Sequence, residues 1–317
     1  MFYFIRHVTR FAYSSPVTES VTEIRMQPRT ESNQRCLQFE VSTQPRARIL
    51  GYRDYAGNIV HHFDIPGRHT QLKITAESNV EIIPTAPLPD RLDDDVWNAL
   101  DAIGDSGEYW DYLFPSKFAV NTELLNQLKD ELQIERRGDP LQLLLRINSA
   151  ISEKFDYAPQ STSVDSPIDD ALRARKGVCQ DFAHIMIALV RQLRIPCRYL
   201  SGYLYHETGG HDRSAADATH AWVEAYLPQL GWIGFDPTNN LIAGERHIRT
   251  AIGRDYADVP PTRGIFKGLA SSELSVAVQV SPTEAPLPEE ELIPITTWAG
   301  SSFIEDDQQQ QQQQQQQ

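Results

Sequence analysis

The chain has 317 residues, of which 40% are apolar, a length that suits about two domains with substantial cores. Its 29 basic and 43 acidic side chains leave a net charge of −14, which argues against nucleic acid or an anionic membrane as a partner. The opening MFYFIRHVTRF carries Arg6 and Arg10 where a secretory signal needs an unbroken apolar stretch, so we expect a cytoplasmic protein.

Residues 1–86 predict a β-rich amino-terminal domain. Short runs rich in β-branched and aromatic residues are typical of strands, and no helical pattern separates them. These runs cover residues 2–5, 38–41, 58–63 and 73–76. We therefore expect a small antiparallel β-sandwich, which ends near Pro84, Pro87 and Pro89.

Residues 87–305 predict a second domain of the α+β class. A helical period begins near residue 93, and the firmest early helix covers residues 140–154. Strand-like segments follow at residues 197–205, 218–227 and 232–236. A further β-like run, residues 274–280, could return to either domain. Residues 306–317 end in ten consecutive glutamines, a composition with nothing to bury, so we expect a disordered tail.

Two helices are predicted around Cys179. The first has the form of a capping box, with Pro167 at its first helical position and Gly177 as its carboxyl-terminal cap. The second begins near Cys179 and ends before Pro196. Cys179 therefore lies in a first helical turn, where free N–H groups and the helix dipole favour thiolate over thiol. A lone cysteine at this position is more often a small buried residue than a nucleophile.

The last two strand-like segments bring a histidine and a carboxylate together. Alternation along residues 218–227 places His220 and Trp222 on the face opposite the apolar one. On the next strand Asp236 has the same parity, so a hairpin puts it directly opposite His220 or one diagonal step away. A carboxylate beside an imidazole fixes the ring's tautomer and stabilises its protonated form. Cysteine, histidine and aspartate in this order suit acyl transfer by a thiol.

Three blocks of the sequence resemble the signature blocks of the transglutaminase-like superfamily, whose core has a papain-like fold. They are GVCQDFA at residues 177–183, THAWVEAYL at 219–227 and GWIGFDPT at 231–238. The opening HVTRFAYSSPV, residues 7–17, is similar to the β-rich amino-terminal region of bacterial members, which are often described as cysteine proteases. The resemblance covers nearly the whole chain except the tail.

The resemblance implies a role for each block. Cys179 would be the nucleophile, His220 the general base and then acid, and Asp236 the residue that orients His220. The backbone N–H of Cys179 would supply part of the oxyanion site. The animal crosslinking enzymes have a tryptophan upstream of the cysteine for the second donor, and a tryptophan directly after it. This chain offers Tyr157 and Gln180 at those places.

Two further residues are candidates for substrate or oxyanion contact beside Tyr157 and Gln180. Asp181 lies in the first turn after Cys179, where a structural role with the helix dipole is the stronger interpretation. Trp222 shares a strand face with His220. No metal-ligand spacing is present, and no cofactor is implied.

The leading functional hypothesis is a thiol-dependent amide hydrolase or peptidase that forms a thioester on a peptide or protein carboxamide. The departures at Tyr157 and Gln180 favour hydrolysis over transferase crosslinking, because water is the default acceptor unless a site excludes it. Transfer of the acyl group to an amine is the alternative reaction. A binding module that keeps the fold without turnover is the alternative of a different class.

Overall fold

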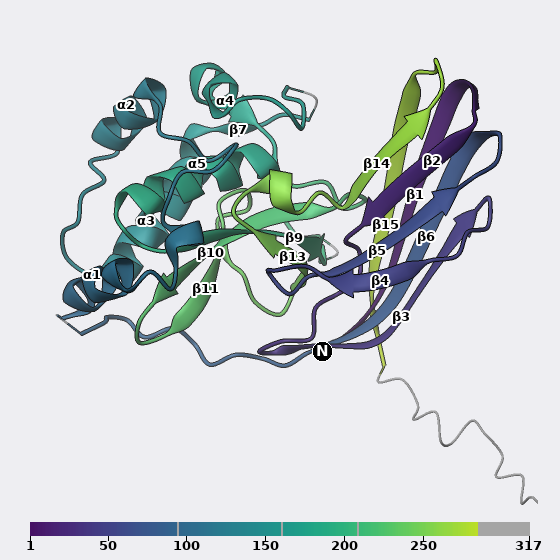
Figure 1. Ribbon diagram of the computed structural model, residues 1–317. Coiled ribbons are helices and arrows are strands. Elements are labelled where there is room, and N and C mark those ends of the chain that lie inside the picture. The colour runs from purple at the N-terminus through teal and green to yellow at the C-terminus, as the bar shows by residue number, and fades with distance from the viewer. Residues whose placement is uncertain (94, 160, 208, 285–317) are drawn as a thin grey trace, which may run out of the picture. The chain divides into compact units, whose positions relative to one another are not determined.

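The computed structural model describes residues 1–93, 95–159, 161–207 and 209–284, which form one compact unit. Figure 1 shows a β-sandwich and, beside it, a second sheet with helices. The α+β class and the antiparallel sandwich expected from the sequence are both confirmed. The predicted disordered tail, residues 306–317, lies outside the described residues.

The sandwich consists of two antiparallel four-stranded sheets. One has the order β15-β1-β6-β3, with bounds Ser272–Thr283, Phe2–Val17, His69–Ile82 and Gln34–Gln44. The other has the order β14-β2-β5-β4, with bounds Thr262–Lys267, Glu19–Ile24, Ile59–Ile65 and Leu50–Arg53. Strand β6 alternates between buried and partly exposed side chains, as expected for a strand with one face on a core.

Strands from both ends of the described chain build this sandwich. Strand β15 pairs with β1 from Phe2↔Thr283 to Tyr13↔Ser272, and β14 pairs with β2. The run 274–280, whose placement the sequence left open, therefore belongs to the sandwich. Its strands come from residues 2–82 and 262–283, whereas the division made from the sequence ended this domain at residue 86.

Within the described residues, five α-helices lie between the two parts of the sandwich in sequence. They are α1 (Val96–Ser106), α2 (Glu123–Glu131), α3 (Pro140–Lys154), α4 (Ile168–Ala174) and α5 (Cys179–Gln192). The prediction of α3 is confirmed, because Asp139 accepts the backbone N–H of Leu141 at 2.7 Å and Pro140 follows as the first helical residue. None of the helices described is long and apolar enough to cross a membrane.

A five-stranded antiparallel sheet completes the unit. Its order is β12-β11-β10-β9-β13, with bounds Leu241–Ile242, Gly231–Asp236, His220–Leu227, Cys197–Leu204 and His247–Gly253. The apolar side chains of β10 and the buried side chains of α5 belong to one core cluster, so this helix lies against the sheet. Strands β7 (Asp156–Tyr157) and β8 (Lys176–Gly177) form a short parallel pair just before α5.

The helix before Cys179 corrects two predictions. Pro167 is the N-cap of α4 and not its first helical residue. Arg175, with φ 52°, ends the helix in the left-handed conformation, so Gly177 is not the cap. Gly177 lies in β8 instead, where a Cβ would come within 2.8 Å of the Asp181 carboxylate. A glycine at this place is therefore explained by close packing against the start of the next helix.

Candidate active site

Cys179 is the first residue of α5 and is half-buried. The turn that carries it is fixed by Asp181, which accepts the backbone N–H of Val178 at 2.8 Å and the hydroxyl of Thr162 at 2.6 Å. Burial raises the pKa of Asp181, although these hydrogen bonds oppose the shift. Asp181 thus has the contacts of a helix-capping carboxylate, and it fixes the backbone that carries the Cys179 side chain.

His220 and Asp236 meet on one face of the five-stranded sheet. The β10–β11 register pairs Val223 with Phe235, and its continuation places Asp236 opposite Trp222, one diagonal step from His220. Nε2 of His220 lies 2.8 Å from Oδ2 of Asp236. Both side chains are almost completely buried, so their interaction is little screened by solvent.

Nδ1 is the other ring nitrogen of His220. Nδ1 is buried and has no hydrogen-bond partner among the described residues. Burial alone would lower the pKa of His220, but the charge and hydrogen bond of Asp236, together with interactions from Cys179, raise it to about 10. The His220 imidazole therefore lies between the Asp236 carboxylate, which it contacts through Nε2, and Cys179.

Asp236 is held by hydrogen bonds on both carboxylate oxygens. Oδ1 accepts the backbone N–H groups of Thr238 at 3.0 Å and Asn239 at 3.2 Å. Oδ2 accepts the side-chain amide of Asn239 at 2.8 Å in addition to His220. Burial would raise the pKa of Asp236, but His220 and His247 hold it well below its usual range. A carboxylate satisfied in this way stays charged and cannot rotate.

His247 is a residue of this site that the sequence reasoning missed. It is the first residue of β13, and its Nε2 lies 3.2 Å from Oδ2 of Asp236. His220, Asp236 and His247 also have the donor types of a metal site, with ligand atoms within 4.8 Å of one another. In the structure these atoms are engaged with one another. Nothing in the three sequence blocks pointed to residue 247, which lies on a different strand.

The other residues predicted to contact the substrate or the oxyanion have different surroundings in the structure. Tyr157 is half-buried, and its pKa is raised by burial and by the nearby Cys179. Gln180 donates its amide to the carbonyl of Val164 at 3.0 Å. Trp222 is buried and stacks on His220, with ring centroids 5.9 Å apart. Trp222 thus packs against the imidazole of His220.

The packing of Trp222 depends on a glycine in the neighbouring strand. Gly202 of β9 is paired with His220, and a Cβ there would lie 2.7 Å from the Trp222 ring and 2.0 Å from the carbonyl oxygen of Ile248. Only hydrogen fits in this space. The register of β13 shifts between Arg249 and Ala251, close to this contact.

The other two cysteines lie in strands, as predicted. Cys36 is half-buried in β3, and burial raises the pKa of its thiol to about 11. Cys197 is buried in β9, and burial raises its pKa to about 12. His184, one turn beyond Cys179, is a buried histidine that stacks on Phe118 and accepts the backbone N–H of Tyr256.

Comparison with known families agrees with this geometry. The model of the bacterial transglutaminase-like N-terminal region matches residues 3–81, and that of the transglutaminase-like superfamily matches residues 127–237, which contain all three candidate catalytic residues. The chain belongs to the transglutaminase-like superfamily. The expectation from the signature blocks is therefore confirmed.

Relatives of this transglutaminase-like chain occur in several bacteria. An uncharacterised protein of Mycobacterium leprae is 34% identical over 277 residues, covering 87% of this chain and 96% of its own length. Another from Mycobacterium tuberculosis H37Rv is 35% identical over 305 residues, covering 89% and 93%. A protein-glutamine gamma-glutamyltransferase of Pseudomonas aeruginosa is 31% identical over 141 residues, covering 40% of this chain and 20% of its own.

A solved structure shares the fold. The crystal structure of a candidate cysteine protease from Cytophaga hutchinsonii superposes with a TM-score of 0.66 at 24% sequence identity. It covers 90% of this chain and 92% of that one. The likeness therefore includes the sandwich as well as the transglutaminase-like core.

Proposed function

We propose that this transglutaminase-like protein is a thiol-dependent amide hydrolase that acts through Cys179, His220 and Asp236. The observation that carries the proposal is the His220 imidazole, which is bound by a buried carboxylate on one nitrogen and has the other free for the thiol. A nucleophile, a base and a group that orients the base are the three parts that acyl transfer requires.

The proposed reaction has two halves. The Cys179 thiolate attacks the carbonyl carbon of a carboxamide, and the C–N bond breaks as His220 gives its proton to the departing amine. A thioester remains on Cys179. A water molecule then loses a proton to His220 and attacks the thioester carbon, the C–S bond breaks, and a carboxylic acid is released with restoration of the Cys179 thiolate beside protonated His220. Asp236 remains ionised throughout and stabilises the imidazolium.

Two donors would stabilise the oxyanion of each tetrahedral intermediate. The N–H of Cys179 is in the first turn of α5, where backbone donors have no intrahelical acceptor. The second donor would be the hydroxyl of Tyr157. β7 places Tyr157 directly beside Gly177, two residues before the nucleophile.

Transfer to an amine is the second candidate reaction. It is favoured by the sequence similarity to the Pseudomonas gamma-glutamyltransferase, which extends over 40% of this chain. The first half of the reaction is the same in both cases, and only the acceptor that attacks the thioester differs. The substrate in either case would be a peptide or protein that carries a carboxamide.

The test compares Cys179→Ala with Cys36→Ala on a library of glutamine- and asparagine-containing peptides. Release of ammonia or amine should fall by at least about 10³-fold in the first variant and stay unchanged in the second, because removal of a nucleophile leaves only binding and oxyanion stabilisation. Cys36 is a matched control, since it lies in the sandwich strand β3. Turnover that survives in Cys179→Ala would refute the proposal.

A labelled primary amine in the same assay separates the two reactions. Hydrolysis gives a free carboxylate without label, whereas acyl transfer incorporates the amine in a Cys179-dependent way. Binding of peptides without any turnover, in a protein whose Cys179 is reduced, would instead support a non-catalytic binding module.

A further inference from the structure

His247 makes a hydrogen bond to Asp236 whose direction can be assigned. Its Nδ1 accepts the backbone N–H of Gly244 at 3.4 Å, so this nitrogen carries no proton. Nε2, 3.2 Å from Oδ2 of Asp236, must then carry the proton and donate it. Burial lowers the pKa of His247, which agrees with a neutral ring. His247 is therefore a neutral donor to the same oxygen that binds His220.

The ring of His247 is itself fixed by packing. It meets Trp222 edge-on, with centroids 5.2 Å apart, and Trp222 also stacks on His220, whose ring centroid lies 6.1 Å from that of His247. His247 is 6% exposed, so no solvent could replace its hydrogen bond at low cost. The two histidines thus reach one carboxylate oxygen from different strands, β10 and β13, with Trp222 packed against both.

Strand β13, which carries His247, is an edge strand whose outer side is covered by the sandwich. Gln34 of β3 makes two hydrogen bonds to Arg249: its amide donates to the carbonyl at 2.8 Å, and its oxygen accepts the N–H at 2.8 Å. Asn58 makes the equivalent pair with Ile252, again at 2.8 Å for both bonds. Gln34 and Asn58 are each 1% exposed.

These contacts mean that two side-chain amides of the sandwich take the place of a neighbouring strand. They satisfy the edge of β13 at two positions that flank its irregular pairing with β9. The position of β13 along the edge of the catalytic sheet is therefore fixed from the sandwich side as well as by β9. The position of β13 in turn decides where the His247 ring can lie.

We propose that His247 is a positioning residue of the catalytic triad and that the amino-terminal sandwich, by holding β13, sets the orientation of Asp236 and His220 through it. The sandwich then contributes to the geometry of the active site. The inference rests on the proposed function only in assigning Asp236 and His220 to the chemistry, and it can be tested without an amide substrate.

The first test compares His247→Phe with His247→Gln. Phenylalanine keeps a ring against Trp222 but has no donor, whereas glutamine keeps an N–H donor of similar reach. We expect the rate of Cys179 alkylation by iodoacetamide near neutral pH to fall about tenfold in the Phe variant, because one hydrogen bond to a charged group is lost. In the Gln variant the rate should stay within about threefold of the wild-type rate. Site assignment by mass spectrometry separates Cys179 from the other thiols.

A spectroscopic signature accompanies this rate. The proton between His220 Nε2 and Asp236 should give a far-downfield imidazole resonance in the wild type and in the Gln variant, broadened or shifted in the Phe variant. A purely structural role would change the unfolding midpoint without this selective pattern. Equal alkylation rates in wild type and His247→Phe, with the resonance unchanged, would overturn the proposal.

The second test addresses the sandwich. Gln34→Met removes both hydrogen bonds to Arg249 at similar side-chain volume, and Gln38→Met, on the same strand but exposed, is the matched control. Gln34→Met should slow alkylation of Cys179 about threefold, and Gln38→Met should not. In the His247→Phe background, Gln34→Met should add nothing, because the route through His247 is already lost. An equal loss in both backgrounds contradicts the coupling.

Two other outcomes can be told apart from a wrong inference about His247: a variant that does not fold, and a proposed function that is itself wrong. Circular dichroism identifies a Gln34→Met protein that does not fold, and Asn58→Ser, at the second contact with β13, then takes its place in the same comparison. If Cys179→Ala leaves peptide turnover intact, the proposed function fails while the alkylation result stands. If Cys179→Ala abolishes turnover but His247→Phe alkylates normally, only the positioning role fails.

Discussion

At the scale of single residues, the carboxylate of Asp236 is the most constrained group in the site. It is fully buried and accepts hydrogen bonds from two histidines, two backbone N–H groups and one side-chain amide. This number of donors explains why the group stays charged without solvent. The same donors make an amide of equal size a poor substitute, because its NH₂ must face at least one of them.

Asp236→Asn is therefore expected to lower the rate of amide turnover by about 10³-fold, since the imidazolium loses its counter-charge and its preferred tautomer. The measurement is kcat/KM on a peptide that the wild type hydrolyses, with Asp170→Asn, an exposed carboxylate of α4, as the control. A loss below about tenfold would show that Asp236 does not orient the base.

Gly202 offers a prediction about stability at the same scale. Gly202→Ala should lower the free energy of unfolding by about 2–3 kcal/mol, because the new methyl group overlaps the Trp222 ring and the Ile248 carbonyl oxygen. Gly67→Ala, where nothing lies within 4 Å, should change it by less than about 0.5 kcal/mol. Urea unfolding of the two variants decides the matter, and equal stabilities would contradict the close packing seen at Gly202.

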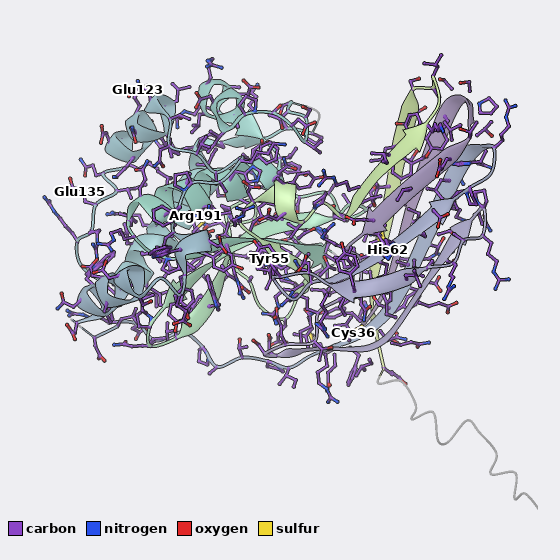
Figure 2. The ribbon with its side chains drawn as sticks, in the orientation of Figure 1. Cys36, Tyr55, His62, Glu123, Glu135 and Arg191 are labelled. Atoms are coloured by element: carbon purple, nitrogen blue, oxygen red, sulfur yellow. The ribbon has the colours of Figure 1, made fainter. Side chains whose placement is uncertain are left out.

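At the scale of elements, α5 is anchored at both ends. Asp181 caps its beginning, and near its end Arg191 is buried, donating to the backbone carbonyls of four residues. These acceptors are Tyr112, Phe114, Cys197 and Arg254. Figure 2 labels Arg191 within the helical part of the molecule. One guanidinium thus ties α5 to β9 and to two loops.

Arg191→Met should destabilise the protein by about 3 kcal/mol or more, because several buried carbonyl groups lose their donors at once. Arg173→Ala, which breaks an exposed ion pair on α4, should cost less than about 1 kcal/mol. Thermal and urea unfolding measure both. Should Arg191→Met be as stable as Arg173→Ala, the carbonyl contacts would have to be satisfied by water.

The elements also show what the sequence could predict. Alternation along β10 and β11 was enough to place His220 and Asp236 on one face, because strand parity is a local property. His247 was not predictable in this way, since its strand pairs with β9 and not with either strand of the hairpin. The glycine at 177 was misassigned as a helix cap because a sequence pattern does not show that the Asp181 carboxylate occupies the space beside it.

At the scale of the whole molecule, buried histidines set the dependence of stability on pH. Burial lowers the pKa of His7 and His184 from 6.5 to about 4, so below pH 6.5 the unfolded chain binds protons that the folded chain does not. The pKa of His220 is raised from 6.5 to about 10, so between these values the folded chain keeps a proton that the unfolded chain loses. The shifts of these three histidines predict a stability that falls in both directions from about pH 6.5.

The free energy of unfolding should therefore decrease by about 1.4 kcal/mol per pH unit for each of His7 and His184 on the acid side, and by about the same for His220 on the alkaline side. Urea unfolding at several pH values tests the shape of this curve. His7→Gln should reduce the slope of the unfolding free energy against pH on the acid side by about 1.4 kcal/mol per pH unit, and should leave the slope on the alkaline side unchanged. A curve that is flat from pH 5 to 9 would contradict the assigned protonation states.

Which segments of the chain supply the strands of the sandwich is the part of the fold that the sequence predicted least well. Residues 2–82 read as strands from their own composition, but nothing local in residues 262–283 shows which sheet they join. The pairing of β15 with β1 is set by the matching of apolar side chains on two strands from opposite ends of the described chain. Long-range pairing of this kind depends on the complete structure and not on a window of sequence.

The pairing of β1 with β15 has a consequence for synthesis of the chain. The first strand leaves the ribosome long before its partner, and the residues that build the five-stranded sheet are made in between. A nascent chain that stops before residue 262 lacks β14 and β15 and so leaves β2 and β1 as open sheet edges, which are templates for association with other copies. Completion of the last strand is therefore also the step that closes these edges.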